Sequence, residues 1–163
     1  MKKTSMMLCI IFIFIAFSYG NEKKLKVFIL AGQSNMVGHG KVEMGLNPEY
    51  KKGEKGNKRE VKGGIGSLRY LATSKKTAPK YKRLIDKNGK WIERDDVYIY
   101  STTSDRNPKK GKLTVGFGKG SWFGPEFAFG HVVGDNIDAP ILIIKTSWGG
   151  KDLFVDFRPP SSG

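Results

Sequence analysis

Cysteine is almost absent from the sequence. The single example among 163 residues is Cys9, which lies in an apolar run near the N-terminus. Removal of that run would leave a chain without thiols, which excludes disulfides, thiolate catalysis and cysteine-based metal sites. Histidine is also scarce, because only His39 and His131 occur and they show no ligand spacing. We therefore expect neither a metal site nor a bound cofactor.

A hydrophobic run long enough to span a membrane is also missing. The run from Met6 to Phe17 has about a dozen residues, and a spanning helix needs roughly 20. Lys2 and Lys3 precede this run and Ser18-Tyr19-Gly20 follows it, which is typical of a secretory signal peptide over residues 1–20, cut before Asn21. A membrane anchor is the alternative. We expect cleavage and a secreted or periplasmic protein with no membrane partner.

Acidic residues are outnumbered by basic ones. The chain has 15 Asp and Glu against 29 Lys and Arg, a formal net charge of +14, which falls to +12 without the leader. The remaining 143 residues, 21–163, suffice for one domain. Lysine and glycine are concentrated at about residues 41–90, most densely from Lys51 to Arg83. We interpret this stretch as a solvated, mobile insertion; a footprint for an anionic polymer is the alternative. No nucleic-acid motif accompanies the charge, so we expect no nucleic-acid partner.

The apolar runs that are present predict an α/β domain. Val27–Leu30 and Ile141–Ile144 are continuous apolar runs, which indicates strands buried on both faces. A third strand is expected at Val97–Tyr100, and a short helix from Pro125 to near Gly134. Strands that alternate with helices favour a parallel sheet, and such sheets bind ligands at the carboxyl ends of their strands.

One serine follows the first predicted strand directly. Ser34 lies in the sequence AGQSNM, where the strand pattern stops and a helical turn is expected to open. Its hydroxyl would point over the carboxyl end of the sheet, among backbone N–H groups that have no helical partner. This position suits a nucleophile, although the residues alone favour a helix N-cap. A second turn of small residues, Gly149-Gly150, follows the last predicted strand.

Four sequence blocks occur in order along the chain. They are AGQSNM (31–36), RDDVYIY (94–100), FGPEFAFGHVVGD (123–135) and LIIKTSWGGKDL (142–153). Together they resemble the carbohydrate esterases of the sialate O-acetylesterase type, carbohydrate esterase family 6, within the SGNH hydrolase superfamily. The resemblance implies a three-layer α/β/α, flavodoxin-like fold with a parallel sheet. It also implies a serine esterase that removes O-acetyl groups from a carbohydrate substrate.

The same resemblance implies roles for particular residues. Ser34 would be the nucleophile, and backbone donors near it and at Gly149 and Gly150 would hold the oxyanion. Gln33 and Asn35 could add side-chain donors. For Gln33 a role in the turn and a role in the pocket stay open, whereas for Asn35 local hydrogen bonding within the turn is favoured.

The general base is the point at which the sequence departs from this family. The resemblance implies an Asp-x-x-His motif near the end of the domain, and the sequence contains none. Neither His39 nor His131 occupies that place, so we expect neither to be the base, and we expect Glu126 to be a helix-start carboxylate. A serine without a base is a weak nucleophile. We therefore expect a C-terminally incomplete part of an exported esterase; a non-catalytic carbohydrate-binding protein on the same fold is the alternative.

Overall fold

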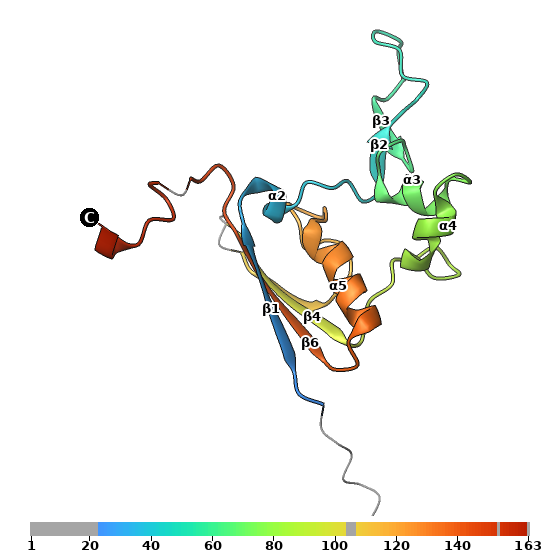
Figure 1. Ribbon diagram of the computed structural model, residues 1–163. Helices are drawn as coiled ribbons and strands as arrows, with labels where there is room; N and C mark the ends of the chain where they lie inside the picture. Colours follow the sequence, from blue (N-terminus) through green and yellow to red (C-terminus); the bar gives the residue numbers. More distant parts are fainter. Residues whose placement is uncertain (1–22, 104–106, 153, 163) are drawn as a thin grey trace, which may run out of the picture.

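A four-stranded sheet with the order β1-β6-β4-β5 forms the centre of the molecule (Figure 1). The computed structural model describes residues 23–103, 107–152 and 154–162; the expected leader lies outside them. The strands are β1 (Lys26–Gly32), β4 (Val97–Thr103), β5 (Lys109–Lys112) and β6 (Ile141–Ser147). β6 is parallel to both β1 and β4, as the sequence predicts. β5 pairs antiparallel with β4 and was not predicted, because its sequence KKGK has no apolar run.

Helix α5 (Pro125–Asn136) covers one face of this sheet (Figure 1). It extends two residues beyond the stop predicted near Gly134. Beneath it, four inward side chains of β4 and β6 are almost fully excluded from solvent: Val97, Ile99, Ile141 and Ile143. Leu113 and Phe117 complete this cluster. Phe28 of β1 packs edge-on against Phe129 of α5, with 5.2 Å between ring centroids. The core therefore lies between α5 and the three parallel strands.

The opposite face of the sheet carries no helix among the residues that the structure describes. Alternate residues of a strand point to opposite faces, so Phe28 meets the core while Val27 and Ile29 face outward. Ile29 is 70% exposed, and Tyr98 of β4 is 49% exposed. The prediction that Val27–Leu30 is buried on both faces is thus wrong for the described chain. Sheet and α5 form two layers, and the three-layer arrangement that the resemblance implies is not seen within them.

Residues 41–90 contain more structure than the sequence predicts. A hairpin of β2 (Met44–Leu46) and β3 (Glu60–Lys62) is followed by α3 (Leu68–Thr73), α4 (Ala78–Tyr81) and the 3-10 helix η1 (Lys82–Leu84). Leu68 and Leu84 are buried against Phe127 of α5. Contrary to the expectation of a solvated insertion, α3 and η1 therefore form a second buried cluster with α5. Residues 51–56, at the tip of the hairpin, are exposed.

The chain beyond β6 leaves the sheet and reaches a second 3-10 helix, η2 (Pro160–Ser162) (Figure 1). Phe154 and Val155 on this stretch are largely exposed. No helix within the described ranges is both long and apolar enough to cross a membrane.

Candidate active site

The carboxyl ends of the parallel strands bring two turns together. Gly32 at the end of β1 pairs with Ser147 at the end of β6, and Thr103 at the end of β4 pairs with the same serine. The residues that follow these ends must therefore be neighbours. After β1 the chain enters the short helix α2 (Ser34–Val37), and after β6 it enters the turn at Gly149-Gly150.

A pocket of about 340 Å³ lies at this edge of the sheet. Its lining consists of Ser34, Val37, His39, Thr103, Lys119, Gly149 and Gly150. The structure thus brings together three of the residues predicted from the sequence, Ser34 and the two glycines. Gln33 and Asn35 do not belong to the lining.

Gly149 lies directly beside Ser34. A Cβ atom built at Gly149 would be 3.7 Å from the Cα of Ser34 and 3.8 Å from its Cβ. The N–H of Trp148 donates to the carbonyl of Gly32 at 3.0 Å, which fixes the turn to the end of β1. Among the described residues, the backbone N–H groups of Gly149 and Gly150 donate to no carbonyl. Within these residues both N–H groups are therefore free of backbone hydrogen bonds.

Ser34 is the first residue of α2 and does not cap it. The N-cap position is Gln33, and no side chain makes a capping hydrogen bond there. The interpretation of Ser34 as an N-cap, which the residues alone favoured, is therefore wrong. Ser34 is exposed, and within the described chain its hydroxyl makes no hydrogen bond. Gln33 thus forms part of the turn, and the serine oxygen is left open to a ligand.

The end of α2 packs closely against the start of α5. Gly38 has a φ of 88°, in the left-handed region that favours glycine, and its N–H donates to the carbonyl of Ser34 at 3.2 Å. A Cβ atom at Gly38 would lie only 2.4 Å from the Cα of Gly124. Glycine is required here both by the backbone angle and by the lack of space.

A buried ion pair lies behind α2. The Nζ of Lys145, on β6, is 2.6 Å from the Oε2 of Glu126, on α5, and neither side chain is exposed. The ammonium also donates to the carbonyls of Val37 at 3.0 Å and Phe117 at 2.9 Å. All three of its protons therefore have acceptors. The pair connects β6, α5, the end of α2 and the segment around Phe117.

Glu126 makes one contact that the sequence predicts and one that it does not. Its Oε1 accepts the N–H of Gly124 at 2.8 Å, so it is a helix-start carboxylate as expected. Its second oxygen is the counter-ion of Lys145, whose pKa is lowered by burial, with Glu126 acting in the opposite direction. No pattern in the sequence indicates that Lys145 is buried, because lysine is almost never fully buried unless it is paired.

The two histidines occupy different environments. His39 lines the pocket, and its ring packs edge-on against Trp122 with 5.9 Å between centroids. His131, on α5, is 4% exposed and packs against Phe127 with 4.7 Å between centroids. Burial lowers the pKa of His131, and the charges of Arg94 and Arg83 act in the same direction. Of the two, only His39 is placed near Ser34.

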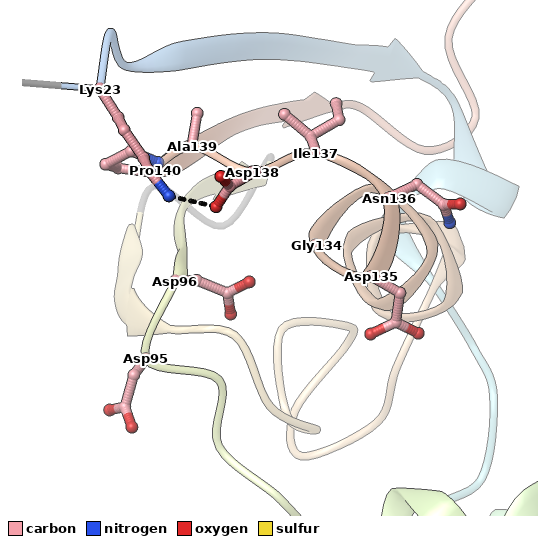
Figure 2. Close-up of a pocket in the computed structure, with 10 residues that line it drawn as sticks. All are labelled: Lys23, Asp95, Asp96, Gly134, Asp135, Asn136, Ile137, Asp138, Ala139 and Pro140. Atoms are coloured by element: carbon pink, nitrogen blue, oxygen red, sulfur yellow. Dashed lines mark hydrogen bonds and ion pairs between the residues drawn. The ribbon is translucent and has the colours of Figure 1, made fainter. Parts of the chain in front are cut away.

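A second hollow lies at the opposite end of the sheet (Figure 2). Its acidic side chains precede β4 or β6 or end α5: Asp95, Asp96, Asp135 and Asp138. Arg94 pairs with Asp96 at 2.7 Å and with Asp135, and these contacts lower the pKa of both carboxyls. Lys23 pairs with Asp138. This hollow is therefore an ion-pair network at the amino ends of the strands. Over the described ranges, no group of three or more His, Cys, Asp or Glu could hold a metal ion.

Comparison with known protein families gives one match. Residues 24–161 match the family SASA, described as carbohydrate esterase, sialic acid-specific acetylesterase. The matched region includes Ser34, the Gly149-Gly150 turn and the Lys145–Glu126 pair. Searches of curated proteins and of solved structures found no match.

Proposed function

Because the chain belongs to the SASA family of carbohydrate esterases, the sialic acid-specific acetylesterases, we propose that it removes O-acetyl groups from sialic acid with Ser34 as the nucleophile. The observation that supports this most directly is the contact between Ser34 and Gly149. A Cβ atom built at Gly149 would lie 3.7 Å from the Cα of Ser34, and the N–H groups of Gly149 and Gly150 donate to no carbonyl among the described residues. The family implies an SGNH-like fold, in which the exposed face of the sheet would be covered by a third layer.

The proposed chemistry is acyl transfer through a covalent intermediate. The Oγ of Ser34 attacks the acetyl carbonyl carbon, and the electron pair of the C=O bond moves to the oxygen. The N–H groups of Gly149 and Gly150 stabilise this oxyanion, an effect of about 3–4 kcal/mol per donor. The sugar oxygen then leaves with a proton, and water hydrolyses the acetyl-serine to acetate.

The proton of Ser34 needs a base. Residues 1–163 contain no Asp-x-x-His motif, and the one histidine that lines the pocket is His39. We propose that the base is the Asp-x-x-His histidine that the family resemblance implies, supplied from outside residues 1–163. We further propose that residues 1–20 direct the protein to secretion or to the periplasm.

Acetate release from O-acetylated sialic acid tests this function. We expect little activity from the 163-residue chain, and activity from a longer product of the same gene that includes an Asp-x-x-His motif. Ser34→Ala should reduce the turnover of the active form on the order of 10⁴-fold or more, whereas Ser121→Ala should not. His39→Ala should leave most of the activity. Strong Ser34-dependent activity in the 163-residue chain that His39→Ala abolishes would identify His39 as the base.

A second function is supported by the same serine. Because no described residue hydrogen-bonds its hydroxyl, Ser34 as it stands is not activated. Binding of the sugar without turnover, in a non-catalytic carbohydrate-binding protein, would fit this geometry. This alternative would be favoured if both the 163-residue chain and the longer product bind the sugar and neither releases acetate.

A further inference from the structure

Lys119 is a cation in the pocket of Ser34 that has no counter-ion among the residues the structure describes. It is exposed, and it lines the pocket together with Ser34 and Gly149. No aspartate or glutamate belongs to the lining. Within the described chain Lys119 forms no salt bridge, whereas nine other pairs do. Among the described residues, the pocket therefore presents one positive charge without an acidic partner beside the proposed nucleophile.

The backbone that carries Lys119 is fixed relative to Ser34. The N–H of Lys119 donates at 3.0 Å to the carbonyl of Gly38, the residue that ends α2. Its own carbonyl accepts from the N–H of Trp122 at 3.1 Å, and the N–H of Gly118 donates to the carbonyl of Trp122 at 2.8 Å. These bonds close a tight turn on the end of the helix that begins with Ser34.

A second lysine holds the same turn from the other side. The Nζ of Lys109, on β5, donates to the carbonyls of Gly116 and Gly118, each at 2.8 Å, and to that of Gly120. The ammonium of Lys109 is thus bound by three backbone carbonyls of the turn, whereas the charge of Lys119 remains available to a ligand in the pocket. A fixed backbone lowers the entropy that must be lost when a ligand is bound.

We propose that Lys119 binds the carboxylate of the acidic sugar whose acetyl ester lies on Ser34. This inference rests on the proposed function, because sialic acid carries a carboxylate that neutral O-acetylated sugars lack. The volume of about 340 Å³ is near the lower limit for small-molecule sites, about 300–1,000 Å³, which suits one sugar residue better than a chain of them. Lys119 would then select acidic sugars over neutral ones and orient the ester toward Ser34.

Calorimetric titration of the 163-residue chain tests the proposal without catalysis. The two ligands are N-acetylneuraminic acid and its methyl ester, which differ in the negative charge and little else. We expect the acid to bind about fivefold more tightly, the size of one partly exposed ion pair. Lys119→Met should remove this preference and Lys119→Arg should keep it. Lys87→Met removes the same charge from an exposed position outside the pocket and should keep the preference. Added salt should weaken it.

Each remaining outcome overturns the proposal. Equal binding of acid and ester by the wild-type chain, or no binding of either, would exclude a carboxylate site. An equal loss in Lys87→Met would assign the preference to net charge. Failure of the proposed function looks different: the preference for the acid would persist and depend on Lys119, while no form of the protein would release acetate through Ser34.

Discussion

Lys145 and Glu126 form an ion pair with no exposed surface on either side chain and 2.6 Å between Nζ and Oε2. The ammonium is also bound by the carbonyl of Val37, the last residue of α2. Helix α2, the start of α5 and the strand that leads to Gly149 therefore share one buried charge. Removal of either partner would leave the other charge buried and unpaired, which is the costly case for an internal ion pair.

We predict that Lys145→Met or Glu126→Gln alone lowers the free energy of unfolding by about 3–5 kcal/mol. The double variant should cost less than the sum of the two, because the charges are removed together. Urea unfolding measures all three. Lys112→Met, which breaks the exposed pair with Asp95, should leave the unfolding midpoint unchanged. Additive losses in the double variant would contradict the coupling.

The two glycines next to Ser34 should respond differently to alanine. At Gly149 a Cβ finds ordinary contacts, the nearest at 3.7 Å, so stability should change little while the methyl group narrows the pocket at Ser34. At Gly150 the φ of 72° should make alanine cost about 1–2 kcal/mol. In the active form of the protein, Gly149→Ala should therefore reduce acetate release without lowering the melting temperature. The reverse pattern would mean that Gly150, not Gly149, faces the reacting atoms.

The sequence predicts the part of the site that depends on strand ends. Apolar runs placed β1 and β6, and a parallel sheet brings the residues after both strands to one edge, so Ser34 and Gly149 could be expected as neighbours. His39 and Lys119 could not. They reach the pocket because residues 38–40 pair with the segment that ends at Phe123, and such long-range pairing leaves no local pattern.

Buried polar contacts are the other feature that the sequence does not predict. Lys145 follows an apolar run directly, and only its three acceptors, drawn from segments far apart in the sequence, explain why it is inside. The packing of α3 was missed for a similar reason. The apolar residues of α3 are too few to form a core by themselves. Leu68 is nevertheless buried, because it packs against the face of α5 that carries Phe127.

Within residues 41–90, trypsin should cut first at the tip of the hairpin. Lys51, Lys52 and Lys55 are exposed, whereas Arg69 in α3 is half-buried and pairs with Glu43 at 2.7 Å. Mass spectrometry of early fragments gives the order of cleavage. Replacement of the three lysines with glutamine should delay the first cut. Early cleavage at Arg69 would show that α3 opens as readily as the tip.

The uncovered face of the sheet should bind apolar dyes. Ile29 is 70% exposed and Val27 is 51% exposed, and β4, which lies on the other side of β6, adds Tyr98 and Tyr100 to the same face. Contiguous exposed apolar surface of this kind marks an interaction site or an aggregation risk. We expect anilinonaphthalene sulfonate fluorescence to rise with the folded protein and to fall in Ile29→Lys, with little change in the unfolding midpoint. Ile143→Lys, on the buried face, should instead unfold the protein.

The free energy of unfolding should decrease as the pH is lowered through a range set by His131. Burial holds the pKa of His131 below its ordinary value of 6.5; Arg94 and Arg83 add to this, and Asp135 and Asp96 oppose it. The unfolded chain therefore takes up the proton first as the pH decreases, so the free energy of unfolding declines once the pH passes below about 6.5 and stops declining below the lowered pKa.

His131→Leu should remove this decline. Leucine fills the space against Phe127 and replaces an Nε2 that has no hydrogen-bond partner among the described residues, so stability at neutral pH should be equal or higher. Urea unfolding at a series of pH values on both sides of 6.5 gives the slope for each protein. The carboxyls of Asp96 and Asp135, whose pKa values lie below 3.8 because of Arg94, lose their contribution only in more acidic solution. An unchanged slope in His131→Leu would therefore assign the decline to a group other than this buried imidazole.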